Sequence, residues 1–525
     1  LEVLLQNSTK LCKKLLLVRF NVTIQGHSDS FWLTLFLGSK RKRDGNEEEP
    51  NPKRVKYQSK LFLTVKIDPK GIYLLWKAIM NNDVKESKIN DNLKEFRLPS
   101  NVTWLSGETN VLLIRRCSQD LYDLICSENI RKNGGVVVTG NPGIGKSWFL
   151  NYILMRELSK GSTVYVEQRV KKTAWLFTPT EPPREIPDCK PPDELYAKKN
   201  EDSNSAVYLF DPYGEKTAEP IEVPTAFTIV TASPNKRHYK QFYKRVRLKY
   251  YLPVWSLPDC LDARNSFTPE MPLSEEQVKE RFEIFGGIPR FIFGDLNAYA
   301  SMRKDLDASI SACKVSEITQ SLGSFELIPG ASHKLLQYDV GADFTTSSVK
   351  FASDYIANMI FSTLVERERE NLLSWTRTGA PAVLQSVRGT FMELFAHETL
   401  PRGGTFNVRC LTHNLADTTV DISPMSMEAL DSTAFSSGKV DVYYKPIIGT
   451  YPGIDAFAKI NGVLCGFQMT VSESHPITAK FVDEVLFPSF GVTCERNTPG
   501  RADKDKQRKQ ECETLISENT SMFHL

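Results

Sequence analysis

The chain has 525 residues, of which 41% are hydrophobic and 25% are charged. These proportions are ordinary for folded proteins and exclude both a wholly disordered chain and a polytopic membrane protein. Lys and Arg number 66 against 63 Asp and Glu, so the net charge of +3 indicates no particular partner. No stretch reaches the roughly 18 apolar residues of a membrane span, and we expect no membrane partner. The ten cysteines form no C-x-x-C pair, which argues against a disulfide scaffold or a zinc ribbon and favours reduced thiols.

The N-terminal region carries candidate targeting signals. Two lysines precede a short apolar run at residues 15–18, but Arg19 interrupts it, so the signal-peptide pattern is incomplete. Basic clusters at residues 40–43 and 52–56 flank an acidic spacer in a segment rich in Gly, Asn and Pro. Such a segment is typical of a bipartite nuclear localisation signal, which binds the acidic groove of a nuclear import receptor. A solvated linker is the alternative.

A glycine-rich loop is the strongest signal in the chain. It comprises Gly140, Asn141, Pro142, Gly143, Ile144, Gly145, Lys146 and Ser147 and fits the P-loop pattern G-x-x-x-x-G-K-S. We predict a helix over 105–130, a strand over 136–138 just before the loop and a helix over 147–158 after it. Glycines let backbone N–H groups point at phosphate oxygens, while the lysine adds charge and the serine hydroxyl binds Mg²⁺. The loop predicts binding of ATP or GTP with Mg²⁺; a glycine turn without a ligand is the alternative.

A P-loop site needs a further magnesium ligand at the end of a neighbouring strand. Residues 206–210 are apolar and are followed by Asp211, which we assign with Ser147 to the metal. Pro212 comes next, so a general base stays unassigned. Glu215 is a weak candidate for that base, and a surface turn residue is its more frequent role.

Later segments offer two further contacts to phosphate. A strand predicted at 226–231 ends near Ser233 and Asn235, which either sense the γ-phosphate or form an ordinary turn. A predicted helix at 274–284 precedes a Gly-Gly-Ile-Pro-Arg turn, whose Arg290 either reaches a phosphate from a lid or meets solvent. A cationic stretch within 236–249 either touches phosphate or forms a solvated helix face.

The sequence of residues 390–471 predicts a β-hairpin that carries an acidic residue. A helix over 390–397 holds Glu393, strands are expected at 440–444 and from 454, and Asn461-Gly462 favours a tight turn into a return strand over 463–471. The hairpin can place Asp455 and Gln468 on one face, near Glu393. This is the layout of PD-(D/E)xK nucleases, which hold Mg²⁺ on oxygen ligands.

We assign Glu393, Asp455 and Gln468 as candidate catalytic residues, with Asp455 as a metal ligand. The pattern departs from those nucleases because Gln468 replaces the second acid and Thr470 stands where the lysine is expected. Lys480 or His475 are the possible substitutes. The residues therefore favour the fold more strongly than they favour cleavage.

Taken together, these motifs resemble the Crinkler and retrotransposon hot spot proteins. The resemblance covers roughly 105–485 and pairs the GNPGIGKS loop with the GGIPR turn, and the P-G-I-D455 start with the G-F-Q468-M-T strand and His475-Pro476. It implies a P-loop NTPase followed by a restriction-endonuclease-like domain. The Crinkler branch implies a secreted effector that acts in the nucleus of a host cell, with DNA and host nuclear proteins as partners. The family's L-x-L-F-L-A-K header is only echoed at 33–40.

The expected fold class is α/β: a P-loop NTPase domain with a parallel sheet, a helical linker and then an α/β restriction-endonuclease-like domain. The boundaries are an N-terminal targeting region 1–60, a linker 61–104, the NTPase domain 105–296, a helical connecting region 297–375, the nuclease-like domain 376–490 and a polar tail 491–525. Two alternatives stay open. One is a non-catalytic NTP-switched protein whose last module binds DNA or a nuclear protein, and the other is a small-molecule kinase.

Overall fold

The structure is a computed structural model of a mixed α/β protein that divides into two compact units. It describes residues 15–20, 69–105, 109–168, 173–196, 206–212, 219–234, 236–267, 273–320, 332–377, 382–410, 418–430, 439–446, 455–460, 463–469 and 522–524. The first unit, here the P-loop unit, comprises 65–397 and 471–473. The second, here the hairpin unit, comprises 1–64, 398–470 and 474–525.

A seven-stranded sheet in the order β11-β5-β10-β9-β6-β7-β8 forms the centre of the P-loop unit. Its strands are β5 Gly135–Thr139, β6 Val164–Gln168, β7 Thr173–Phe177, β8 Arg184–Glu185, β9 Ala206–Asp211, β10 Ala226–Thr231 and β11 Lys249–Tyr251. β11, β5, β10, β9 and β6 run parallel, while β7 and β8 are antiparallel. The carboxyl ends of the parallel strands therefore meet at one edge, where open α/β sheets bind ligands. The strands predicted at 136–138, 206–211 and 226–231 are confirmed.

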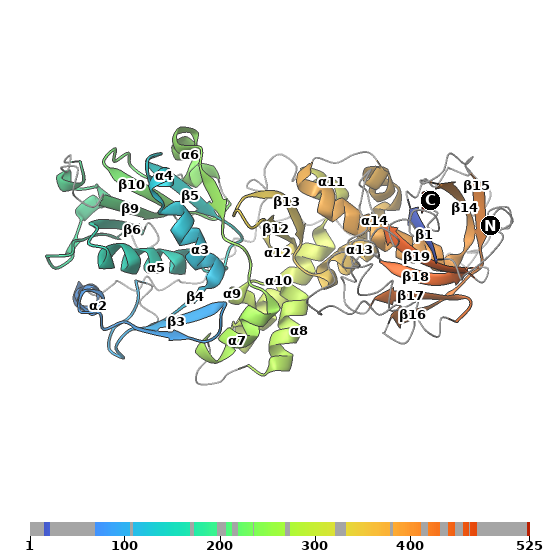
Figure 1. The fold of residues 1–525 in the computed structure, drawn as a ribbon, viewed down its shortest axis with the longest axis horizontal. Helices are drawn as coiled ribbons and strands as arrows, with labels where there is room; N and C mark the ends of the chain where they lie inside the picture. Colours follow the sequence, from blue (N-terminus) through green and yellow to red (C-terminus); the bar gives the residue numbers. More distant parts are fainter. Residues whose placement is uncertain are drawn as a thin grey trace, which may run out of the picture. The chain divides into compact units, whose positions relative to one another are not determined.

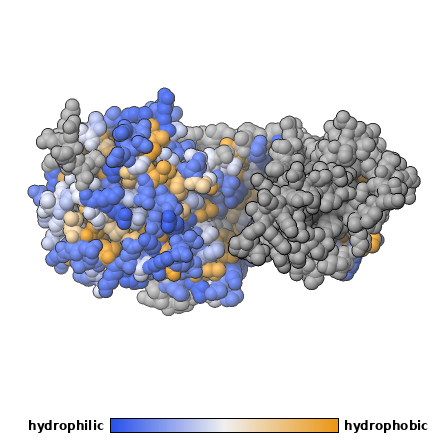
Figure 2. Space-filling view, in the orientation of Figure 1, coloured by the Kyte–Doolittle hydropathy of each residue, from blue (hydrophilic) through white to orange (hydrophobic). Residues whose placement is uncertain are grey.

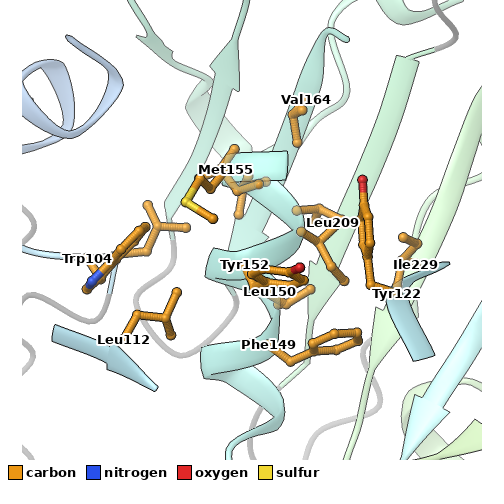
Figure 3. Packing of buried hydrophobic residues seen from close by; sticks show 14 of the residues in the cluster. Trp104, Leu112, Tyr122, Phe149, Leu150, Tyr152, Met155, Val164, Leu209 and Ile229 are labelled. Carbon is orange, nitrogen blue, oxygen red and sulfur yellow. The ribbon is translucent and has the colours of Figure 1, made fainter. Parts of the chain in front are cut away.

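One face of this sheet is covered by α5, Lys146–Ser159, which confirms the helix predicted at 147–158. In Figure 3 the α5 side chains Phe149, Leu150 and Tyr152 lie among strand residues such as Leu209 and Ile229. The strand residues on this face alternate along each strand: Val136 and Val138, Val164 and Val166, Val207 and Leu209, Phe227 and Ile229. The opposite positions, such as Val137 and Val230, pack with α6, Lys240–Val246, on the other side of the sheet (Figure 1).

The segment before the loop differs from the prediction. Residues 111–115 form a strand, β4, which pairs antiparallel with β3, Leu93–Arg97, and only then does α3, Arg116–Ile125, begin. β2 Lys85–Lys88 completes this small sheet. In the sequence, α2 Pro69–Met80 precedes β2, and α4 Glu128–Arg131 follows α3. The helix predicted over 105–130 is thus wrong for 111–115. Four consecutive apolar residues suit a buried strand as well as a helix, and pairing with β3 decided between them.

The chain after the sheet is mostly helical, with one hairpin. Its helices are α7 Leu257–Phe267, α8 Glu275–Phe285, α9 Pro289–Ile292, α10 Leu296–Ala312, α11 Val315–Gln320, α12 Ser332–Leu335, α13 Asp354–Arg377 and α14 Gln385–Thr399. α8 and α14 confirm the helices predicted at 274–284 and 390–397. The largely helical character expected of 297–375 is wrong for β12 Leu336–Val340 and β13 Thr346–Phe351, which pair antiparallel. A short strand pair has too few residues to show its period against the helices that flank it.

The hairpin unit is an eight-stranded sheet in the order β15-β14-β20-β1-β19-β18-β17-β16. Its strands are β1 Leu15–Phe20, β14 Gly404–Cys410, β15 Thr418–Ile422, β16 Ser426–Leu430, β17 Val442–Pro446, β18 Ala456–Ile460, β19 Val463–Met469 and β20 Met522–His524. Ile460 pairs with Val463, so β18 and β19 form the predicted hairpin, although Asn461 and Gly462 lie outside the described residues.

The surface of the described residues is mixed in character. Figure 2 shows hydrophilic residues over most of the coloured part of the visible face, with hydrophobic residues scattered among them. No helix in the described ranges is both long enough and apolar enough to cross a membrane. Cys117, Cys126 and Cys260 are free thiols.

We predict that Gly287→Ala will destabilise the P-loop unit strongly. A Cβ at Gly287 would lie 1.8 Å from the backbone oxygen of Trp255, so one of the two backbones must move. Overpacking of this kind costs about 1–3 kcal/mol, and a clash with backbone lies at the upper end. Gly71→Ala is the matched control, because a Cβ there meets nothing within 4 Å and the site is helical. It should stabilise the protein by about 0.5–1 kcal/mol. Equal melting temperatures for the two variants would contradict the packing at Gly287.

Candidate functional site: a P-loop and the polar ends of a parallel sheet

The glycine loop joins the end of β5 to the start of α5. Three of its residues have positive φ angles: Gly140 at 143°, Gly143 at 87° and Gly145 at 103°. Residues with a Cβ rarely adopt these conformations. The turn brings the amino end of α5 to the edge of the sheet, where helix N–H groups and the helix dipole favour an anion.

The Lys146 side chain lies inside this loop. Its Nζ donates to the backbone oxygens of Gly140, at 2.9 Å, and Asn141, at 2.8 Å. Burial of the ammonium lowers the pKa of Lys146 to about 7, against a raising contribution from Asp211 and with a further lowering by Arg290. The three charged groups are thus close enough to interact. Lys146 and Asp211 were both predicted for one site, and the structure brings them together.

Polar residues end the parallel strands at the same edge. Gln168, Asp211 and Thr231 are the last residues of β6, β9 and β10, and all are buried. Gln168 pairs with Asp211 in the strand register. Side chains alternate along a strand, so these three share the face of Val166, Leu209 and Ile229, which is the face that α5 covers. The edge therefore presents a carboxylate, an amide and a hydroxyl on the side where α5 begins.

Thr231 is a candidate site residue that was not predicted from the sequence. It is 1% exposed, and its Oγ1 has no hydrogen-bond partner among the described residues. β10 lies between β5 and β9, so Thr231 sits between the loop strand and the Asp211 strand. Ser233, the residue named from the sequence, is exposed, and Asn235 lies outside the described residues. Thr231 follows a run of mostly apolar residues, so the sequence indicates only that it is the last residue of a buried strand.

Glu167, beside this edge, does not share the face of α5. It occupies the alternate position on β6, with Tyr165, and accepts a hydrogen bond from the Tyr208 hydroxyl. Tyr208 belongs to the core on the α6 side of the sheet. The carboxylate is therefore a buried partner of a tyrosine. Glu215, the weak base candidate, lies outside the described residues.

The outside of the loop is held by residues far along the chain. Trp255 Nε1 donates to the backbone oxygen of Ile144 at 3.1 Å. Arg115 donates to the backbone oxygens of Val254, at 2.8 Å, and Pro253, at 2.6 Å, and its guanidinium lies 5.0 Å from the centre of the Trp255 ring. Arg115 thus positions the segment that positions the loop.

The Gly-Gly-Ile-Pro-Arg turn also reaches the loop. The Arg290 N–H donates to the Gly143 oxygen at 3.4 Å, and a Cβ at Gly143 would lie 2.9 Å from the Arg290 Cβ. The structure therefore brings Arg290 to the loop. This proximity and the coupling to Lys146 make its guanidinium a candidate phosphate contact, as its position after the turn had suggested.

Asp455, the acid predicted in the hairpin unit, lies at the open end of the β18–β19 hairpin. Its N–H donates to the Phe467 oxygen at 2.7 Å, and its carboxylate accepts the Met469 N–H. Because Ala456 pairs with Phe467, the register places Asp455 opposite Gln468. Glu393 belongs to the P-loop unit, where it lies 3.3 Å from His397 Nε2 on α14. The three-residue nuclease site stays a prediction.

The residues at the sheet edge fit a magnesium–nucleotide ligand. Oxygen ligands suit Mg²⁺, and Ser147, which is exposed at the start of α5, and Asp211 supply them. Mg²⁺ usually keeps several waters and binds one or two carboxylates plus substrate phosphates, as such a pair would allow. No cluster of three or more His, Cys, Asp or Glu side chains suited to a metal occurs among the described residues. The basic clusters at 40–56, and Thr470, His475 and Lys480, lie outside those residues.

Comparison with known proteins finds Crinkler effectors of an oomycete. The chain is 24% identical over 437 residues to Crinkler effector protein 16 of Phytophthora infestans, covering 78% of this chain and 67% of that protein. It is 24% identical over 432 residues to Crinkler effector protein 15 of the same organism, with the same coverage. No protein-family model matches the chain. This homology supports the resemblance drawn from the motifs.

We predict that Trp255→Phe will cost about 1 kcal/mol more stability than Trp175→Phe. Both tryptophans are buried, at 6% and 4% exposure, so each substitution removes a similar apolar area. Of these two, Trp255 Nε1 donates to the Ile144 oxygen, whereas Trp175 Nε1 has no hydrogen-bond partner in the described residues. The difference reflects the buried Trp255 hydrogen bond, which is worth about 0.5–1.5 kcal/mol, together with any change in the Arg115 contact with the ring. Urea unfolding measures it, and equal losses would show that Trp255 does not hold the loop.

Proposed function

We propose that the chain is an effector whose P-loop unit binds and hydrolyses ATP or GTP with Mg²⁺. One observation carries the proposal. A buried lysine inside a curled glycine loop interacts with an aspartate that ends a neighbouring parallel strand, on the face where the loop's helix begins. The proposal is supported because a cation, a helix amino end and a carboxylate lie around one point.

Each residue has a distinct part in this proposal. Loop N–H groups and Lys146 hold the β- and γ-phosphates, and Ser147 and Asp211 hold the metal. Bound Mg²⁺ supplies neutralisation of charge that develops on the phosphate oxygens. Thr231, whose hydroxyl has no hydrogen-bond partner among the described residues, would contact a phosphate, and Arg290 would add a second cation. Arg115 and Trp255 keep the loop in place.

The effector role and its setting rest on the homology. The two similar proteins are named Crinkler effectors, and 78% of this chain aligns with each of them. We extend the proposal to action in the nucleus of a host cell, supported by the basic clusters at 40–43 and 52–56, which fit a nuclear import receptor. DNA is the proposed partner of the hairpin unit, and host nuclear proteins are possible further partners.

We predict that Lys146→Ala will lower nucleotide affinity by about ten- to a hundredfold while the protein stays folded. The substitution removes the ammonium that the phosphates would meet, and interactions with a charged group are worth about 1.5–3 kcal/mol or more. Titration calorimetry with ATP and with GTP, each with Mg²⁺, measures the change, and circular dichroism checks folding. Lys77→Ala, an exposed lysine on α2, is the control and should bind as the parent does. Unchanged affinity in Lys146→Ala would remove the basis of the proposal.

A second candidate is an NTP-switched binding protein whose hairpin unit does not cleave DNA. It is favoured by the Asp455 carboxylate, which already accepts the Met469 N–H, and by the amide at Gln468 where nucleases carry an acid. A site with one fewer negative charge holds Mg²⁺ less strongly, because ligand charge sets the affinity.

Supercoiled plasmid incubated with the protein and Mg²⁺ decides between the two candidates. Nicking that disappears in Asp455→Ala is the expected result for a nuclease. Asp441→Ala, an exposed acid beside β17, serves as the matched control and should retain nicking. Plasmid that stays supercoiled but shifts in a gel with the parent protein would favour the binding module.

A further inference from the structure

The side chain of Asn141 leaves the glycine loop and pairs with a strand far along the chain. Its Nδ2 donates to the Leu336 oxygen at 2.9 Å, and its Oδ1 accepts the Tyr338 N–H at 3.0 Å. Both atoms of the amide thus bond to β12 in the manner of a neighbouring strand. Asn141 is 1% exposed, so neither bond competes with water. Meanwhile the backbone oxygen of the same residue accepts the Lys146 ammonium.

The β12–β13 hairpin has further attachments close to the loop. The Tyr251 N–H donates to the Phe344 oxygen at 2.7 Å, and the Tyr251 and Tyr338 rings lie 4.8 Å apart. The next residue after Tyr251, Leu252, puts its backbone oxygen 2.7 Å from where a Gly140 Cβ would be. The loop and the hairpin are therefore held through the same short stretch at the end of β11.

The β12–β13 hairpin also contacts the turn that carries Arg290. The Gln337 amide donates to the Phe285 oxygen at 3.4 Å, and a Cβ at Gly286 would lie 2.0 Å from the Ala352 oxygen. Ser353, at the start of α13, donates to the Ile284 oxygen at 2.9 Å. One hairpin thus connects the loop, the Arg290 turn and α13.

The residues just before β12 approach the loop lysine. His333, on α12, is close enough to Lys146 for the two side chains to interact electrostatically, and burial together with that ammonium lowers the pKa of His333 to about 4. The imidazole is neutral at physiological pH, so it can donate to a phosphate oxygen without adding charge. The segment 333–338 is therefore bonded to the loop at Asn141, and its first residue lies within electrostatic range of Lys146.

We propose that this segment forms a wall of the nucleotide site and that Asn141 couples nucleotide binding to docking of the β12–β13 hairpin. The inference rests on the proposed function, whose regulation it describes. Phosphates compete with the Asn141 oxygen for the Lys146 ammonium, and the amide of the same residue holds β12. Binding and docking are then linked, and each changes the other by the same free energy.

Hydrogen exchange with and without ATP and Mg²⁺ tests the coupling. In the parent protein, nucleotide should change the exchange of amides in 336–351 at least fivefold, beside the change expected in the loop itself. In Asn141→Ala the change in 336–351 should fall below twofold. Asn358→Ala is the matched control, because its amide bonds within α13, to the Asp354 oxygen, and it should respond as the parent does. If Asn141→Ala does not fold, Asn141→Asp keeps the acceptor for Tyr338 and loses the donor to Leu336.

Three outcomes overturn the inference, and they differ in what else they remove. Parent protein that binds ATP in the calorimeter without any exchange response in 336–351 overturns the coupling and leaves the proposed function standing. A full response in both Asn141 variants overturns the role of Asn141. Parent protein that binds neither ATP nor GTP overturns the coupling and the proposed function together.

Discussion

The close approach of other backbone segments to the glycine loop is the constraint on which the P-loop unit depends. The loop must turn through left-handed conformations, and its outer side has no space for a Cβ at Gly140 or Gly143. Glycine meets both requirements at once, at an entropic cost that the surrounding contacts offset. The loop's shape is thus fixed from inside by Lys146 and from outside by Trp255 and the Arg290 turn.

The alternation of the strands gives this loop its chemical surroundings. The strands β6, β9 and β10 each end in a polar residue, so the core on the α5 face ends at a row formed by Gln168, Asp211 and Thr231. Burial of that row is favourable only if its groups find partners. Asp211 interacts with Lys146, whereas Thr231 Oγ1 lacks a partner in the described residues. A site that leaves such groups ready for a ligand is suited to binding rather than to stability alone.

Local patterns predicted the parts of the site that the chain forms from neighbouring residues. The strand 136–138, the loop and the helix 147–158 follow one another directly, and their apolar periods agree with their roles. The predictions that were wrong concern segments whose structure depends on pairing with distant residues. Residues 111–115 form a strand because they pair with β3, and β12 pairs with β13 within a mostly helical region. Asn141 and Leu336 are 195 positions apart and Arg115 and Val254 are 139 apart, so no local pattern links them.

The two units differ in how closely the observed contacts agree with the site residues predicted from the sequence. In the P-loop unit the predicted lysine and aspartate interact within one compact body, so the geometry adds to what the motif implied. In the hairpin unit the β18–β19 hairpin sets Asp455 opposite Gln468 in register, yet the carboxylate is engaged by a backbone N–H and the opposite residue is an amide. A fold does not by itself imply an activity, because packing and catalysis depend on different residues. Homology at 24% identity to two Crinkler effectors therefore argues for an effector role and not for a particular activity of the hairpin unit.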